Sequence, residues 1–190
     1  QRIAITGMGA MTPIGKSVTE FWQNLTAGVS GIGRLDRFHN DDIPVKVAAL
    51  IRDFNPELHM PKRLARDSSL FSQYAFAAAR EALGQSGIDP AAEAGRTGIT
   101  MGTSMSGVVD IAATQDEMTR SGESKVSPRF VPKILGNIAA AQIAIEYGLR
   151  GPSMTVSTAC SSGGDAIKLA MMLLQAGEAD VMLAVGAESI

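Results

Sequence analysis

The residue in this 190-residue sequence best suited to covalent chemistry is its single cysteine, Cys160. It follows a short apolar run at 153–157, typical of a buried strand, and a helix is predicted over 160–176. The free N–H groups and the dipole at the start of a helix stabilise negative charge. We therefore predict that Cys160 is a thiolate nucleophile. The amides at this helix start, the backbone N–H of Cys160 among them, are predicted to hold the oxyanion formed when it attacks a thioester carbonyl.

The alternative interpretation of a lone cysteine is inert core packing, which is the commoner role of such a residue. The neighbours of Cys160 favour the chemical role, because Ala159, Ser161 and Gly163 are small and leave room for a substrate to reach the sulfur. One cysteine also excludes an internal disulfide and a cysteine-based metal cluster, so no metal site is predicted.

The elements that must position Cys160 are strands of low polarity separated by helices. Strands are predicted at 2–8, 45–51, 97–103, 153–157 and 180–187, and the stretch 31–65 is otherwise irregular. Helices are predicted at 17–28, 69–83, 107–120, 130–147 and 160–176, the first with Ser17 and Glu20 as a capping box and Gly28 as its stop. On the last helix, the pattern places Ile167, Ala170, Met171 and Leu174 facing inward. This alternation predicts an α/β fold with a mostly parallel sheet between helices.

The composition excludes several classes of function. The formal net charge of −2 gives no positive field for nucleic acid. No apolar stretch reaches the roughly 20 residues that a membrane span needs, and the first residues lack the sections of a signal peptide. We therefore expect a cytoplasmic protein that binds neither nucleic acid nor membrane.

A dinucleotide-binding loop is suggested by Gly7 and Gly9 after the first predicted strand, but the pattern is incomplete. Thr12 stands where the third glycine belongs, and Pro13 interrupts the start of the helix. The two glycines instead indicate a close approach between backbones.

Seven segments together carry a family resemblance. In this order and spacing the sequence resembles the β-ketoacyl synthases, and it looks most like the second elongation synthase of bacterial type II fatty-acid biosynthesis. The segments are 5–9 with 12–15, 27–32, 127–132, 147–153, 158–161, 179–182 and 186–188.

The resemblance implies a thiolase-like, layered α-β-α fold in which two related halves each carry a five-stranded mixed sheet. Residues 1–190 would be the N-terminal half, an incomplete domain that lacks its last strand, with the C-terminal half absent. An apolar surface would then be left for the missing half to cover.

The resemblance also implies the reaction. Cys160 would accept an acyl group from the phosphopantetheine thioester of acyl carrier protein, and malonyl-acyl carrier protein would lose CO₂ and attack the acyl-enzyme. No cofactor of the protein's own is expected. Relatives supply two histidines and a second oxyanion N–H from the other half, so the fragment alone is predicted to be inactive. His39 and His59, the histidines present here, are predicted to be surface or structural residues.

Other positions carry over from the family one by one, each with a plainer alternative. Asp165 departs from the family pattern, in which histidine is common. A homodimer is implied, with Phe130 sending its ring toward the partner's pocket. The predicted acyl-pocket residues are Met105, Phe130 and Ala159, and core packing would also explain the first two. The predicted carrier-protein contacts, which could equally be solvated charges in a loop, are Lys62, Arg63 and Arg66.

Three alternatives remain open. A polyketide ketosynthase shares the same motifs, and a thiolase shares the fold and a cysteine nucleophile, although the residues around Cys160 favour a synthase. The non-enzymatic alternative is an inert fragment or a partner subunit of the chain-length-factor kind. Such subunits typically lack the nucleophilic cysteine.

Overall fold

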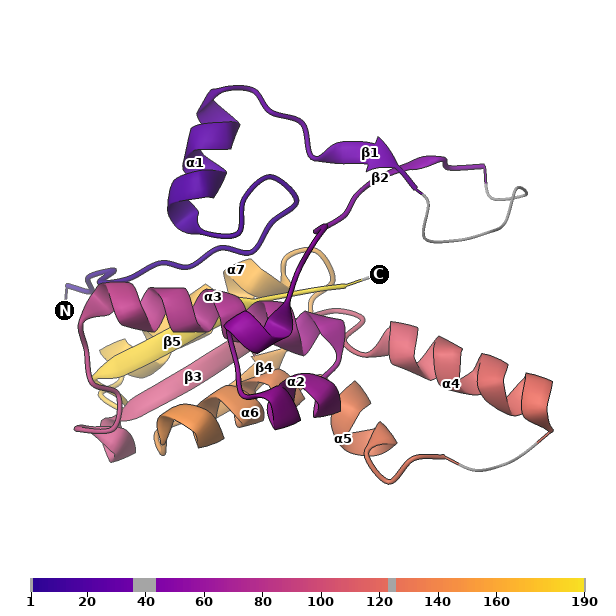
Figure 1. Ribbon diagram of the computed structural model, residues 1–190. Helices are drawn as coiled ribbons and strands as arrows, with labels where there is room; N and C mark the ends of the chain where they lie inside the picture. Colours follow the sequence, from indigo (N-terminus) through magenta and orange to yellow (C-terminus); the bar gives the residue numbers. More distant parts are fainter. Residues whose placement is uncertain (1, 36–43, 123–125, 190) are drawn as a thin grey trace.

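The computed structural model of the protein describes residues 2–35, 44–122 and 126–189 (Figure 1). In chain order, the described helices and strands are α1 Val18–Thr26, β1 Ile32–Arg34, β2 Val47–Ala49, the 3₁₀ turn η1 Pro56–Leu58, α2 Lys62–Asp67, α3 Leu70–Ser86, the 3₁₀ turn η2 Ala94–Arg96, β3 Thr97–Gly102, α4 Val108–Ser121, α5 Phe130–Ile134, α6 Ile138–Tyr147, β4 Ser153–Val156, α7 Ser162–Gln175 and β5 Val181–Gly186.

The main sheet consists of three parallel strands in the order β4-β3-β5. The central strand β3 is buried along its whole length, and its six residues accordingly include no charged side chain. Gly102 at its end is in register with Val156 of β4 and with Gly186 of β5. All three strands therefore end at one edge, and the chain leaves each of them there.

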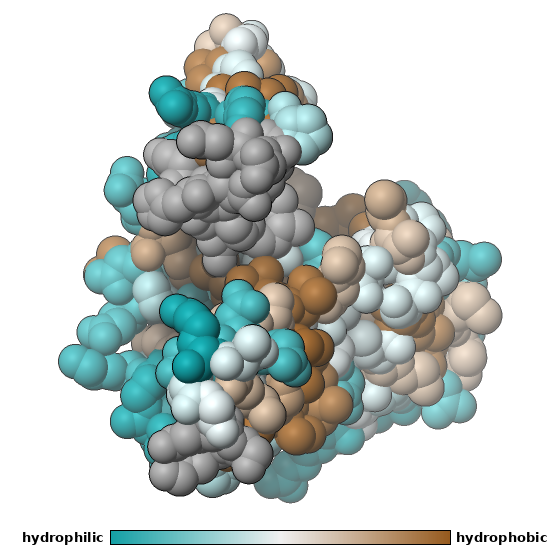
Figure 2. Space-filling view, turned by 90° about the vertical axis from the view of Figure 1, so that its right-hand side faces the viewer, coloured by the Kyte–Doolittle hydropathy of each residue, from teal (hydrophilic) through white to brown (hydrophobic). Residues whose placement is uncertain are grey.

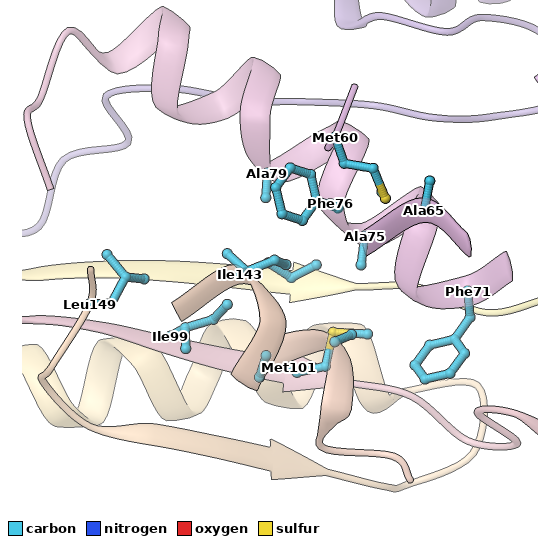
Figure 3. Packing of buried hydrophobic residues seen from close by; sticks show 13 residues of the cluster. Met60, Ala65, Phe71, Ala75, Phe76, Ala79, Ile99, Met101, Ile143 and Leu149 are labelled. Atoms are coloured by element: carbon cyan, nitrogen blue, oxygen red, sulfur yellow. The ribbon is translucent and has the colours of Figure 1, made fainter. Parts of the chain in front are cut away.

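Helices cover both faces of this sheet, so the predicted layered α-β-α arrangement is confirmed. On one face, Ile99 and Met101 of β3 join the core formed with α3 and α6, where Phe71 and Ile143 are fully buried (Figure 3). On the other face, the hydroxyl of Thr100 donates a hydrogen bond of 2.9 Å to a carbonyl of α7. The alternation of side chains along β3 thus divides the two layers.

The first turn of α7 lies directly on the strand ends because glycines occupy the contact. A Cβ atom on Gly102 would lie 2.1 Å from the carbonyl oxygen of Ser162, and one on Gly186 would lie 3.0 Å from the Cα of Gly163. Only residues without a side chain allow this approach.

The N-terminal segment is not the strand that was predicted for residues 2–8. It has no strand partner among the described residues and instead runs in extended form across α3, fixed by the Met8 N–H on Gln85 and the Ala10 N–H on Glu81. Gly7 and Gly9 lie against the α3 backbone, where added Cβ atoms would come within 2.1 and 1.9 Å of carbonyl oxygens. The predicted close backbone approach is confirmed. The apolar pattern indicated an extended chain but carried no information about pairing.

The first helix forms as predicted. The side chain of Ser17 accepts a hydrogen bond from the Glu20 N–H, and Gly28, at φ 72°, ends the helix. Strand β2 falls inside the predicted run 45–51. Its antiparallel partner β1 was not predicted, because three residues are too few to show a period. His39 lies outside the described residues.

Two other predicted helices differ in extent. The helix predicted over 130–147 is divided into α5 and α6 because Leu135 is extended and the next two residues form a turn. Helix α3 continues past Gly84 to Ser86 and ends at Gly87, which adopts φ 65°.

The inward face predicted for the last helix is also only partly right. Ile167 and Met171 are exposed, whereas Ala166 and Ala170 are buried against the sheet. Small residues were needed there because the helix lies so close to the strands.

The described chain exposes many large hydrophobic side chains, among them Ile5, Trp22, Ile32, Leu58 and Ile145. The accessible surface is 11413 Å², against about 8,700 Å² expected for a compact monomer of this mass. Within the described ranges, none of the helices is long and apolar enough to cross a membrane.

Candidate active site

Cys160 lies between the end of β4 and the start of α7, with its side chain exposed. The helix was predicted to start at Cys160. Helix α7 begins at Ser162 instead, so Cys160 precedes it. The difference comes from Ala159 and Ser161, which form a turn before the helix starts. Because the sulfur is accessible and next to a helix start, inert core packing is wrong as an interpretation.

The residues 158–161, here called the cysteine turn, have an unusual backbone. Ala159 adopts φ 52°, a left-handed conformation that is uncommon for residues other than glycine. Two short-range bonds close the turn, from the Ser161 N–H to the Thr158 carbonyl and from the Ser162 N–H to the Ala159 carbonyl. The strained residue directly precedes Cys160.

Side chains brace the same turn from both ends. The buried hydroxyl of Ser162 donates to the Ala159 carbonyl at 2.7 Å and accepts from the Thr158 N–H at 2.9 Å. Asp165 accepts a hydrogen bond from the Thr158 hydroxyl at 2.5 Å. This contribution of Ser162 could not be predicted from the sequence, because serine is a common residue at the start of a helix.

Amides without a recorded acceptor lie close to Cys160 in the sequence. In the part of the chain that the structure describes, the N–H groups of Cys160, Gly163 and Gly164 donate to no recorded acceptor. These donors at the N-terminus of a 14-residue helix can bind negative charge. The oxyanion role of the Cys160 amide stays a prediction, and the two glycine amides are further candidate donors beside it.

Met105 follows β3 and so leaves the sheet at the edge where Cys160 follows β4. Its side chain is exposed, and its N–H donates at 2.9 Å to the carboxylate of Glu188, which follows β5. Glu188 also accepts the Ser104 N–H at 2.7 Å. The role of Glu188 was not predicted.

Hydrophobic residues gather on the side of the molecule on which α4 lies in Figure 1, as the view of that side in Figure 2 shows.

Phe130 is the first residue of α5 and is half-buried. It lines a cavity of about 220 Å³ together with residues of α2 and α4, with Lys133 of α5 and with Arg129, which precedes α5. Ala159 lies in the cysteine turn itself and is exposed. A shared acyl pocket formed by Met105, Phe130 and Ala159 stays a prediction.

The three predicted carrier-protein contacts lie on the short helix α2, not in a loop as was predicted. Lys62, Arg63 and Arg66 are all exposed, because the helix turns Ala65 toward the core. They line a surface cavity of about 610 Å³. Lys62 is 3.7 Å from Glu57, and Arg66 pairs with Asp67 at 3.0 Å.

Asp67 is also 3.4 Å from Arg129 of the neighbouring segment. The hydrogen bond from Arg66 is the main cause that lowers the pKa of this carboxyl group. Asp67 therefore holds the guanidinium group of Arg66 in place on the surface of α2.

His59 packs its ring on Phe54 at 5.5 Å between centroids. Burial is the main cause that lowers the pKa of His59, and the positive charge of Arg80 adds to it. Within the described part of the chain, no cluster of histidine, cysteine or acidic residues could hold a metal ion.

The sequence model of the family described as "Beta-ketoacyl synthase, N-terminal domain" matches residues 1–190. The chain belongs to the β-ketoacyl synthase family. Among curated relatives, the 3-oxoacyl-[acyl-carrier-protein] synthase 2 of Vibrio cholerae is 38% identical over 189 residues and that of Coxiella burnetii 35%. Each match covers 99% of this chain and 46% of the relative. The chain thus spans about half the length of the curated relatives it matches.

Solved structures agree with this assignment. A β-ketoacyl synthase from Burkholderia phymatum STM815 aligns with a TM-score of 0.84 and 29% identity, covering 100% of this chain and 47% of that one. A structure titled "The ishigamide ketosynthase/chain length factor" aligns with a TM-score of 0.86 and 30% identity, covering 98% and 47%. The fold of this ketoacyl synthase domain is therefore the predicted thiolase-like one.

Proposed function

We propose that Cys160 is the acyl-accepting nucleophile of a β-ketoacyl-acyl carrier protein synthase, which catalyses the condensing step of fatty-acid elongation. The observation that carries the proposal is the exposed sulfur in a strained turn, next to unpaired amides at the start of α7. The names of the curated relatives support the same reaction class.

The reaction has two stages. The Cys160 thiolate attacks the carbonyl carbon of an acyl thioester, a new carbon–sulfur bond forms, and the phosphopantetheine thiolate leaves and takes up a proton. The amides of Cys160, Gly163 and Gly164 are the donors available here for the oxyanion. A malonyl thioester then loses CO₂, its carbanion attacks the acyl carbon, and Cys160 leaves as the thiolate.

The decarboxylation groups and a second oxyanion donor are proposed to come from a C-terminal half, which makes this chain the N-terminal half of the enzyme and inactive alone. The excess accessible surface and the exposed hydrophobic residues support a missing covering part. The accessible Cys160, held in a turn by several hydrogen bonds, argues against the alternative of an inert fragment.

The α2 surface is proposed to bind acyl carrier protein, which supplies the substrates on its phosphopantetheine. Lys62, Arg63 and Arg66 present positive charge on one exposed helix, and charge complementarity mainly raises the association rate. Changing Lys62 and Arg63 to Glu should raise KM for acyl carrier protein and leave hydrolysis of a small acyl thioester unchanged. An equal loss on both substrates would overturn the assignment.

Met105, Phe130 and Ala159 are proposed to line the acyl pocket.

A homodimer is also proposed. Strand β4 is an edge strand with Met154 exposed, and a second copy can pair with an open strand edge. Sedimentation of the complete protein tests the dimer. The cytoplasm is the proposed location, because its reducing conditions keep an exposed free thiol such as that of Cys160 reduced.

A polyketide ketosynthase is the second candidate, favoured by the ishigamide structure. That title names a ketosynthase and a chain length factor together, so the likeness does not separate the two subunit types; the presence of Cys160 favours the enzyme. Products formed from repeated malonyl additions without reduction would identify polyketide synthesis, and single condensations on saturated acyl chains would identify fatty-acid elongation.

In the decisive experiment, the complete protein is incubated with acyl carrier protein that carries an acyl thioester, and mass spectrometry locates the added acyl group. We expect the acyl group on Cys160 and no label on the Cys160→Ala variant. The Cys160→Gln variant should fold normally and fail to condense, because an amide cannot accept the acyl group. An equal label on the alanine variant would sink the proposal.

A further inference from the structure

The strained turn before the nucleophile needs a device that holds it. A non-glycine residue at φ 52°, such as Ala159, persists only where its surroundings over-determine the conformation. The backbone bonds that close the cysteine turn are 3.1 and 3.2 Å long, so they are not the tightest constraints on it.

Asp165 supplies the shortest hydrogen bond at this turn. Its carboxylate accepts from the hydroxyl of Thr158 at 2.5 Å, and its own N–H donates to the Ser161 carbonyl at 3.0 Å. Thr158 and Ser161 are the two ends of the cysteine turn. One residue of α7 therefore fastens the chain both before and after Cys160.

The hydroxyl groups of Thr158 and Ser161 make hydrogen bonds with defined donors and acceptors. Ser161 donates to the Thr158 carbonyl at 2.9 Å, and its oxygen lies 3.2 Å from the Thr158 hydroxyl oxygen. The Thr158 hydroxyl has one hydrogen and donates it in the hydrogen bond to the carboxylate. Asp165 therefore fixes the rotamer of Thr158. Charge-assisted bonds of this kind are shorter and stronger than neutral ones.

We propose that Asp165 is a positioning residue for Cys160: through the Thr158 hydroxyl, its carboxylate holds the cysteine turn in the conformation that presents the sulfur to an acyl thioester. The inference rests on the proposed function, because it assumes that Cys160 is the group acylated. It assigns a role to a position at which this chain departs from the histidine common among relatives.

A simpler role would be electrostatic. An acidic residue in the first turn of a helix is stabilising through the helix dipole alone, and that role would not involve Thr158. The two roles differ in their dependence on the hydroxyl group, which a double-mutant cycle measures directly.

The test uses the complete protein. Mass spectrometry follows acylation of Cys160 over a range of concentrations of acylated acyl carrier protein. The variants are Asp165→Ala, Thr158→Val, the pair together, and the conservative Asp165→Asn and Thr158→Ser. We expect each of the first two to lower the maximal acylation rate about tenfold, with the half-saturating concentration unchanged. The double variant should lose no more than either single one.

The conservative variants keep the proposal testable if Asp165→Ala fails to fold. Asp165→Asn keeps an acceptor for Thr158, and Thr158→Ser keeps the donor, so both should acylate within about threefold of the unaltered protein. Three outcomes would overturn the inference: unchanged rates in Asp165→Ala and Thr158→Val, losses that multiply in the double variant, or a Thr158→Ser rate as low as that of Thr158→Val.

The unaltered protein separates this inference from the proposed function. If its Cys160 takes no acyl group, the proposed function fails whatever the variants do. If Cys160 is acylated normally and the Thr158 and Asp165 variants behave independently, only the positioning role fails.

Discussion

The carboxylate of Glu188 accepts a hydrogen bond of 2.9 Å from the backbone N–H of Met105, although 83 positions separate the two residues. The contact joins the chain leaving β5 to the chain leaving β3. Through it, the loop that carries a proposed acyl-pocket residue is fixed to the strand end beside the cysteine turn.

Replacing Glu188 with Ala should release this loop. The N–H groups of Ser104 and Met105 lose a charged acceptor, so we expect the free energy of unfolding to fall by about 2 kcal/mol, measured by urea titration. Acylation by long acyl chains should fall more than acylation by short ones. Glu188→Gln, which keeps one acceptor oxygen, should lose less, and an equal effect on both chain lengths would contradict a pocket role for Met105.

Replacing Gly102 with Ala should displace the start of α7. The added methyl group would lie 2.1 Å from the Ser162 carbonyl oxygen, so we expect a loss of about 3 kcal/mol in unfolding free energy and slower acylation of Cys160. Gly84→Ala is the matched control. It lies in α3 with nothing within 4 Å of the new methyl group and should stabilise the protein by about 0.5–1 kcal/mol. A stable, fully active Gly102→Ala variant would show that α7 can shift freely.

Replacing Thr100 with Val tests the attachment of α7 to β3. The variant keeps the shape of the buried side chain and removes the hydrogen bond to the Ala166 carbonyl. Thermal unfolding should show a loss of about 1 kcal/mol. An unchanged melting temperature would mean that packing alone holds the helix.

The stability of the protein should depend on pH through His59. Its pKa is lower in the folded state than the ordinary value of about 6.5, because burial and Arg80 disfavour the charged ring. The contribution of His59 is therefore complete above about pH 6.5 and declines as the pH falls below that value. The urea midpoint should drop between pH 7.5 and pH 5.5, and His59→Phe, which retains an aromatic ring against Phe54, should show a smaller drop. If both proteins lose the same amount, other groups are responsible.

Much of the architecture could be predicted from the sequence because its signals are local. The Ser17 cap and the apolar run of β3 each depend on nearby residues, and both formed where expected. Cys160 could be singled out for the same reason, since a strand, small residues and a helix follow one another within a short stretch.

What the sequence could not provide was long-range. The segment at 2–8 has the composition of a strand, but strand pairing requires a partner that composition cannot name. The braces of the cysteine turn and the Glu188 contact depend on where side chains meet after folding. Gly84 looked like a helix end, yet α3 continues to Ser86 and is capped by Gly87, which adopts the left-handed φ of 65°.

The glycine-mediated seating of residues 7–9 on α3 has a consequence for biosynthesis. These residues are synthesised before α3, but the surface that receives them is made only when the chain has reached the end of α3. That helix in turn needs the later strands β3 and β5 as its support. During translation Gly7 and Gly9 therefore have no backbone to lie against until α3 has formed, so this contact is made late although its residues are made early.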